Sequence, residues 1–183
     1  MKIIIRAVII ILLSITPFYS QDITPGTLKD KGVLMIATGN DEILTVINTD
    51  YETGAYWFLI KGVAGNRAIG NNLSRLAEVH QLLASSDGKY LAVLSVGEGH
   101  PMVEIIDLPK LLAKNEYTAL HVVDPYPGTL GIDRWEGAKL IIDSTVPLHL
   151  RKEDGRVDSD LLFPEARKFA LNMPAGTIEA LFP

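Results

Sequence analysis

The sequence predicts an all-β protein built from repeated antiparallel units, and three features support this prediction. Its apolar runs are short and rich in Val, Ile and Leu, which favours strands over helices. Polar turns that contain glycine separate these runs. The order of apolar run, turn and partner run occurs three times between residues 32 and 182. We therefore expect short antiparallel strands joined by tight turns.

The second unit has the clearest pattern. A polar stretch at residues 85–89 precedes an apolar run at 90–96, and a partner run follows at 102–108. We expect Asp87 and Gly88 to form a two-residue hairpin turn, because Gly accepts positive φ and Asp can hydrogen-bond its own backbone. A strand at residues 81–85 is expected before this turn. Pro109 suits the first turn of a helix, which predicts a short helix at residues 108–114.

Similar runs mark the first and third units. Leu34, Leu91 and Leu140 align within the first runs, at separations of 57 and 49 residues. In each partner run an apolar residue precedes Asn or Asp, and we expect these pairs to occupy the same position in each unit: Ile47-Asn48, Ile106-Asp107 and Leu171-Asn172. The glycine-rich segment at residues 62–72 is expected to connect the first unit to the second.

This repeat resembles the WD40-like and YVTN-like β-propeller families in its period, its several strands per unit and its Asp-Gly turn. The resemblance implies one domain of propeller-like blades over residues 21–183, with units at about 32–64, 76–123 and 128–182. Neither a Trp-Asp dipeptide nor a Tyr-Val-Thr-Asn tetrapeptide is present, and Trp135-Glu136-Gly137 replaces the Ser-x-Asp-Gly turn in the third unit. An unrelated antiparallel β-sandwich would show similar periodicity and is the alternative fold.

Three units are fewer than the roughly four blades that a closed propeller needs. The ring is then incomplete, or one unit has diverged, or another chain supplies the missing blades. Proteins normally cover an open edge strand, because it can pair with other chains. We therefore expect either a homo-oligomer or a partner chain that completes the ring.

Residues 1–20 have the features of a secretory signal peptide. Lys2 and Arg6 lie before an apolar stretch at residues 7–13, and Pro17 follows it. This stretch is shorter than the roughly 20 apolar residues that cross a bilayer. We expect cleavage after Ser20 and a secreted protein, periplasmic or extracellular, without a membrane span after cleavage. The sequence contains no Cys, so stability must come from the apolar core rather than from disulfides.

Charge limits the partners that we expect. The net charge is −5, and subtracting the two positive charges of Lys2 and Arg6 leaves −7 after signal cleavage. Binding to nucleic acid needs a basic surface that displaces counterions, so no nucleic-acid partner is expected. A protein or a glycan is the expected ligand.

Motifs for catalysis are not found in the sequence. It contains no Gly-x-Ser-x-Gly, no His-Glu-x-x-His and no Gly-Lys-Ser/Thr motif. No catalytic residue, metal site or cofactor is therefore predicted, which favours a non-catalytic, secreted binding module. The family resemblance implies one alternative, a metal- or cofactor-dependent enzyme of the lactonase or quinoprotein-dehydrogenase type, although fold does not fix function.

One end of the predicted blades collects candidate ligand-binding residues. Because successive strands reverse direction, the segment before the first strand and the turn after the second lie at the same end of a blade. Imidazole and carboxylate groups that share a cleft can bind a metal or perform acid–base chemistry, although His and Asp are also common in turns. Trp135 is expected at the opposite end, packed against its own unit. The candidate residues are Asp41, His80, Glu98, His100, Asp124, Tyr126 and His149.

Overall fold

The computed structural model describes residues 26–28, 32–39, 42–49, 54–61, 65–150 and 163–181. They form three antiparallel sheets and one short helix. The first sheet contains β1 (Gly26–Leu28), β2 (Val33–Gly39), β3 (Glu42–Asn48), β4 (Ala55–Lys61) and β5 (Gly65–Asn71). The middle sheet contains β6 (Glu78–Ala84), β7 (Tyr90–Gly97), β8 (His100–Asp107) and β9 (Ala119–Val123). The third sheet contains β10 (Leu130–Glu136), β11 (Lys139–Ser144), β12 (Arg167–Asn172) and β13 (Thr177–Leu181).

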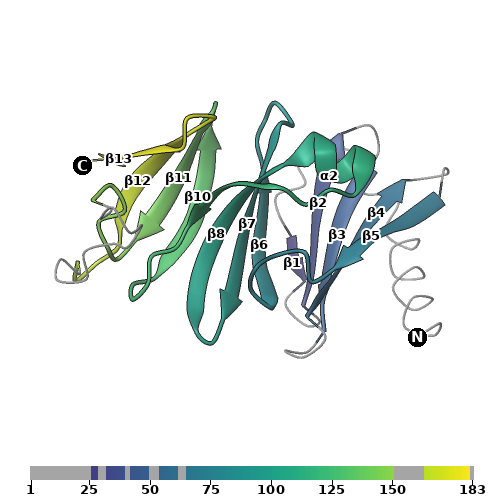
Figure 1. The fold of residues 1–183 in the computed structure, drawn as a ribbon, viewed down its shortest axis with the longest axis horizontal. Coiled ribbons are helices and arrows are strands. Elements are labelled where there is room, and N and C mark those ends of the chain that lie inside the picture. The colour runs from purple at the N-terminus through teal and green to yellow at the C-terminus, as the bar shows by residue number, and fades with distance from the viewer. Residues whose placement is uncertain are drawn as a thin grey trace.

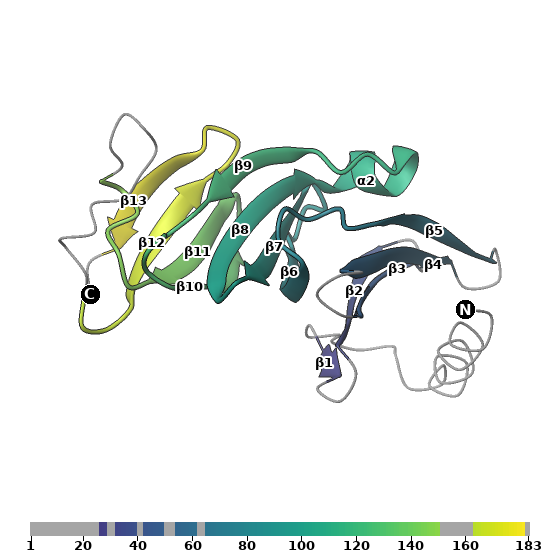
Figure 2. The same ribbon diagram turned by 60° about the horizontal axis from the view of Figure 1, so that its bottom comes forward.

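In every sheet the strands neighbour one another in sequence order, so each sheet is an up-and-down blade. The three blades lie in a row with the middle sheet between the other two (Figure 1). In this row β6 contacts β2 and β3 of the first sheet and β10 of the third. The described sheets do not close a ring (Figure 2). The all-β prediction with propeller-like blades is confirmed, as an open row of three sheets.

Both faces of the middle sheet are covered, and this explains its nearly continuous apolar strands. Leu91, Val93 and Ile106 belong to an apolar cluster shared with the first sheet. Ala92, Val103 and Ile105 belong to a second cluster shared with the third sheet. Side chains of successive residues in a strand point to opposite faces, so an apolar run over β7 and β8 supplies both clusters. The protein therefore has two cores, one on each side of its middle sheet.

Polar side chains also join neighbouring sheets. The Asn48 Nδ2 group donates to the Val79 carbonyl at 2.6 Å, and the Val79 N–H donates to Asn48 Oδ1 at 2.9 Å. On the other side of the middle sheet, Gln81 Nε2 donates to the Ile132 carbonyl at 3.2 Å. His121 Nε2 lies 2.9 Å from the Pro174 carbonyl oxygen. These contacts fix the position of each outer sheet relative to the middle one.

The short helix α2 (Leu108–Lys114) confirms the prediction for these residues. The Asp107 side chain caps it by accepting from the Lys110 N–H at 3.0 Å, and Asn115 ends it in the left-handed conformation. Leu108 and Leu111 are buried in the core between the first and middle sheets. Within the described ranges, no helix has the length and apolar character that crossing a bilayer requires.

Two predictions about local structure are wrong. The β6–β7 connection is longer than a two-residue hairpin turn: the Ser85 N–H donates to the Tyr90 carbonyl at 2.9 Å, and the Gly88 N–H donates to the Ser85 carbonyl at 2.9 Å. Hydrogen bonds from Ser85 and Lys89 lower the Asp87 pKa to about 2. The expected connector at residues 62–72 instead contains β5, because Gly65–Asn71 pair with β4 as a fifth strand.

The third and first units also differ from expectation. Trp135 lies in β10 and packs against the middle sheet, where its ring stacks on Tyr90 with centroids 6.0 Å apart and its Nε1 donates to the Leu83 carbonyl at 3.0 Å. In the first sheet Leu34 pairs with Val46, whereas Leu91 pairs with Ile106 and Leu140 with Leu171. The predicted equivalence of the partner runs is therefore wrong by one residue in the first unit.

Candidate functional site

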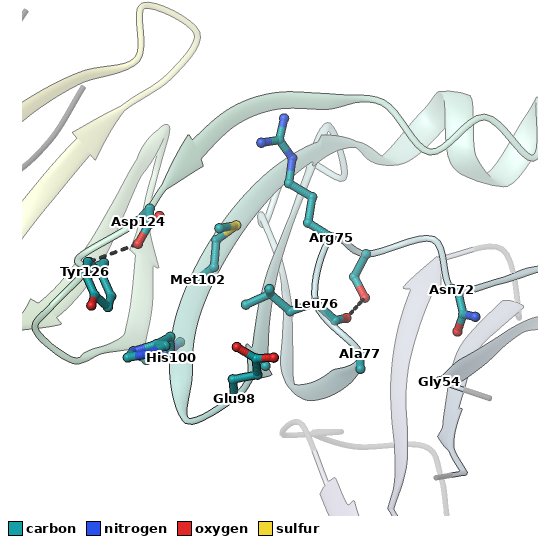
Figure 3. A pocket seen from close by; sticks show the side chains of 13 residues that line it. Gly54, Asn72, Arg75, Leu76, Ala77, Glu98, His100, Met102, Asp124 and Tyr126 are labelled. Atoms are coloured by element: carbon teal, nitrogen blue, oxygen red, sulfur yellow. Dashed lines mark hydrogen bonds between the residues drawn. The ribbon is translucent and has the colours of Figure 1, made fainter. Parts of the chain in front are cut away.

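A groove of about 600 Å³ lies beside the middle sheet (Figure 3). Its walls come from the β7–β8 turn, from the segment that crosses from β5 to β6, and from the start of the β9–β10 connection. Strand pairing brings the start of β6, the β7–β8 turn and the end of β9 to the same end of the sheet. The groove is thus formed where these chain segments meet, and its lining comes mainly from connections.

A tight contact fixes the wall on the side of the first sheet. The Asn72 N–H donates to the Ala55 carbonyl at 2.8 Å, and the Ala55 N–H donates to Asn72 Oδ1 at 3.1 Å. Gly54 lies beside this pair with φ +67°, and a Cβ at this position would lie 1.7 Å from Asn72 Oδ1. Only glycine fits here, because both the backbone conformation and the space exclude a side chain.

A buried carboxylate holds the crossing segment in place. The Glu104 side chain is 1% exposed, and its Oε2 accepts from the Arg75 N–H at 2.9 Å and from the Tyr117 hydroxyl at 2.9 Å. The Arg75 Nε lies 3.6 Å from Glu104 Oε1, while the Arg75 side chain is 60% exposed. Burial, together with the neighbouring Glu104 carboxylate, raises the pKa of Tyr117. Glu104 therefore positions the backbone that forms one wall of the groove.

Aromatic rings lie at the opposite side of the groove. The rings of His100 and Tyr126 meet edge to face, with centroids 4.7 Å apart and planes at 76°. The Tyr126 N–H donates to Asp124 Oδ1 at 2.9 Å, which fixes the turn that presents the tyrosine. Tyr126 is 58% exposed, so its ring is available to a ligand.

The groove combines acidic groups with an apolar surface. Glu98 and Asp124 line it and are exposed, and neither forms an ion pair with another residue that the structure describes. Met102 of β8 and Leu76 of the crossing segment lie between Tyr126 and Asn72 (Figure 3). The Arg75 guanidinium points away from Glu98 (Figure 3). Exposed carboxylates beside an exposed tyrosine suit a cationic group, which can form an ion pair and a cation–π contact.

The structure brings together four of the seven residues predicted for a ligand site: Glu98, His100, Asp124 and Tyr126. The other two histidines of the predicted set lie outside the groove. His80 Nε2 lies 3.4 Å from Glu78 Oε2, and His149 stacks on Phe169 with centroids 5.7 Å apart. Asp41 lies outside the described residues.

Sequence reasoning missed the crossing segment. This segment contributes Asn72, Ser74, Arg75, Leu76 and Ala77 to the groove. The one local signal is Asn72, a residue type that tolerates the positive φ of 49° observed here. In the parts of the chain that the structure describes, no three His, Asp or Glu side chains are grouped as metal ligands would be.

No family model matches the chain, and no curated protein matches its sequence. A solved structure with some similarity is TolB from Acinetobacter baumannii, with 14% sequence identity and a TM-score of 0.46 over 80% of this chain. The chain spans about 30% of the TolB chain.

Proposed function

We propose that this chain is a non-catalytic binding module that holds a basic segment of a partner protein in the groove beside its middle sheet. The observation that supports this proposal most directly is the position of an exposed Tyr126 beside Glu98 and Asp124 in one groove, where neither carboxylate has an ion-pair partner among the described residues. A Lys or Arg side chain of the partner would contact these groups. Apolar side chains next to it would lie on Leu76 and Met102.

The open shape and the mixed lining of the groove support a peptide segment more than a small molecule. Its lining residues are spread from the β3–β4 turn to the β9–β10 connection, so an extended chain can contact several of them at once. Pockets for small molecules are usually concave and enclose most of the ligand surface. The net charge of −5 also favours the approach of a basic partner.

The proposal also includes the secretion of the chain and the kind of repeat that it contains. We propose that residues 1–20 direct secretion, supported by the charged and apolar pattern of that segment. The three units at about 32–64, 76–123 and 128–182 are proposed as WD40-like or YVTN-like repeats of one domain over residues 21–183. Measuring the N-terminal residue of the protein after export tests the first point: a start at Gln21 is expected, and retention of Met1 contradicts it.

The binding proposal is tested by selecting random linear peptides displayed on phage against the immobilised protein. We expect enrichment of peptides that contain Lys or Arg next to apolar residues. Tyr126→Ala and Asp124→Asn should each weaken binding of the selected peptides about tenfold, measured by titration calorimetry. Binding should also weaken with added salt, because exposed ion pairs are screened.

His149→Ala provides the matched control, since His149 is an exposed residue of the predicted set that lies outside the groove. This variant should bind the selected peptides as tightly as the unmodified protein. Selected peptides that bind the Tyr126→Ala and His149→Ala variants equally well would contradict the proposal. A selection without any basic preference would do the same.

A further inference from the structure

The face of the first sheet that is turned away from the middle sheet carries no charged residue on β2, β3 or β4. Strand pairing settles which residues share this face, because Leu34, Leu44 and Trp57 point into the core on the other side. We call the remaining set the apolar end face. It consists of Val33, Met35, Ala37, Ile43, Thr45, Ile47, Tyr56, Phe58 and Ile60.

Most of the apolar end face is partly exposed. Among its nine residues only Thr45, at the centre, is buried in the structure. The rings of Tyr56 and Phe58 stack side by side with centroids 6.5 Å apart. None of the labelled strands and helices lies beyond the first sheet on this side (Figures 1 and 2). A contiguous apolar surface of this kind usually marks an interaction site.

The free face of the third sheet, at the other end of the row, has the opposite character. Lys139 Nζ lies 2.7 Å from Glu179 Oε1, and Lys168 Nζ lies 2.6 Å from Asp133 Oδ2 and 3.2 Å from Asp143 Oδ1. Beneath these side chains Ile141 and Ala170 are fully covered. We call this surface the charged end face. Its charged residues are Asp133, Arg134, Glu136, Lys139, Asp143, Lys168 and Glu179.

This contrast decides how two copies of the chain can meet. A head-to-tail arrangement would place the charged end face of one copy on the apolar end face of the next. Burying these ion pairs against an apolar surface costs free energy, because the charges lose their water without gaining partners. Two apolar end faces can meet without burying a charge of β2, β3 or β4. A two-fold axis brings the same surface of each copy into contact.

We propose that the apolar end face binds the same face of a second copy of this chain in a two-fold symmetric dimer. The two charged end faces then point outward, as the polar outer faces of terminal repeats do in other layered proteins. Three strands of seven residues cover roughly 14 Å by 23 Å, or about 320 Å² per copy. Typical stable complexes bury about 800 Å² per partner, so the dimer is expected to be weak and to depend on protein concentration.

This dimer differs from the ring closure expected from the number of units. It extends the row of sheets from three to six and leaves both ends charged. The proposal concerns a surface other than the groove, since none of the nine residues of the apolar end face lines it. The binding function can therefore fail while the dimer holds, and the reverse is also true.

Light scattering coupled to size-exclusion chromatography tests the proposal on the full chain over a range of protein concentrations. We expect the mass to rise from that of one copy to that of two. Phe58→Glu places a carboxylate on the apolar end face and should keep the protein monomeric. Thr177→Glu places one on the charged end face and should leave the dimer unchanged. Circular dichroism shows whether both variants fold.

Spin labels test the orientation without a disruptive substitution. The chain has no Cys, so Ala68→Cys, in the row with Phe58, and Thr177→Cys, on the charged end face, each carry one label. We expect a dipolar distance between copies labelled at residue 68 that is far shorter than any between copies labelled at 177. A chain that stays monomeric at every concentration overturns the proposal. A short distance between label 68 of one copy and label 177 of another overturns it as well.

Discussion

The first and third sheets are built alike but end the row in different ways. Both are up-and-down sheets with one face in a core, where Trp57 in β4 and Phe169 in β12 are each at most 1% exposed. Their free faces differ, because alternate residues of β2–β4 are apolar whereas those of β10–β13 are mostly charged. The residues that point outward therefore determine whether a blade is open to further packing or ends the row.

This difference also bears on the expectation that a ring needs more than three units. A sheet that packs against a neighbour on each side must present an apolar face to both, as the middle sheet does with its two cores. The third sheet presents paired charges on its free face, with Ile141 covered by long side chains. Packing of a further sheet is therefore favoured on the first sheet and disfavoured on the third.

The largest expected effect separates the two faces of the third sheet. Phe169→Ala removes a ring from the core shared with the middle sheet and should lower the free energy of unfolding by about 3–5 kcal/mol. Lys168→Ala, at the adjacent position on the charged end face, should cause a much smaller loss, because its ion pairs are exposed to water. Urea denaturation measures both. Equal losses in the two variants would contradict the assignment of the faces.

A smaller effect is expected on the free face of the first sheet. Trp57→Ala should cost about 3–5 kcal/mol, because its ring is fully buried. Phe58→Ala, on the apolar end face, should cost about 1 kcal/mol in dilute solution, since its ring is partly exposed. The Phe58→Ala loss should grow with protein concentration, because the dimer stabilises only the unmodified chain. Thermal denaturation at two concentrations measures this, and a loss that does not change with concentration would argue against a covered face.

Much of this fold could be predicted from local sequence patterns. Leu34, Leu91 and Leu140 were expected in strands, and each is the buried second residue of one. The one-residue error in the first partner run arose from a register shift between Ala37 and Gly39. Without this shift Leu34 would pair with Ile47, as predicted, instead of with Val46. Strands are encoded locally, whereas their register also depends on such irregularities.

The candidate site could be predicted only in part. The antiparallel order of the strands brings two connections to one end of the middle sheet, and there Glu98, His100, Asp124 and Tyr126 lie together. The crossing segment was missed because a distant residue sets its course: Glu104 accepts a hydrogen bond from the Arg75 N–H, 29 residues away. A contact of this kind leaves no pattern in the local sequence.

The smallest expected effect concerns pH and the charged end face. Lys168 lowers the pKa of Asp133 from its ordinary 3.8, and Lys139 lowers the pKa of Glu179 from its ordinary 4.5. A carboxylate with a lowered pKa stabilises the folded state above its ordinary pKa, and this contribution is lost as the pH falls through the lower, folded value. The urea midpoint should therefore decrease between about pH 5 and pH 3. Glu179→Gln should reduce this decrease slightly, whereas Thr45→Val, on the uncharged face of the first sheet, should leave it unchanged. An identical pH dependence in the unmodified chain and in Glu179→Gln would show that the Lys139–Glu179 pair does not stabilise the third sheet.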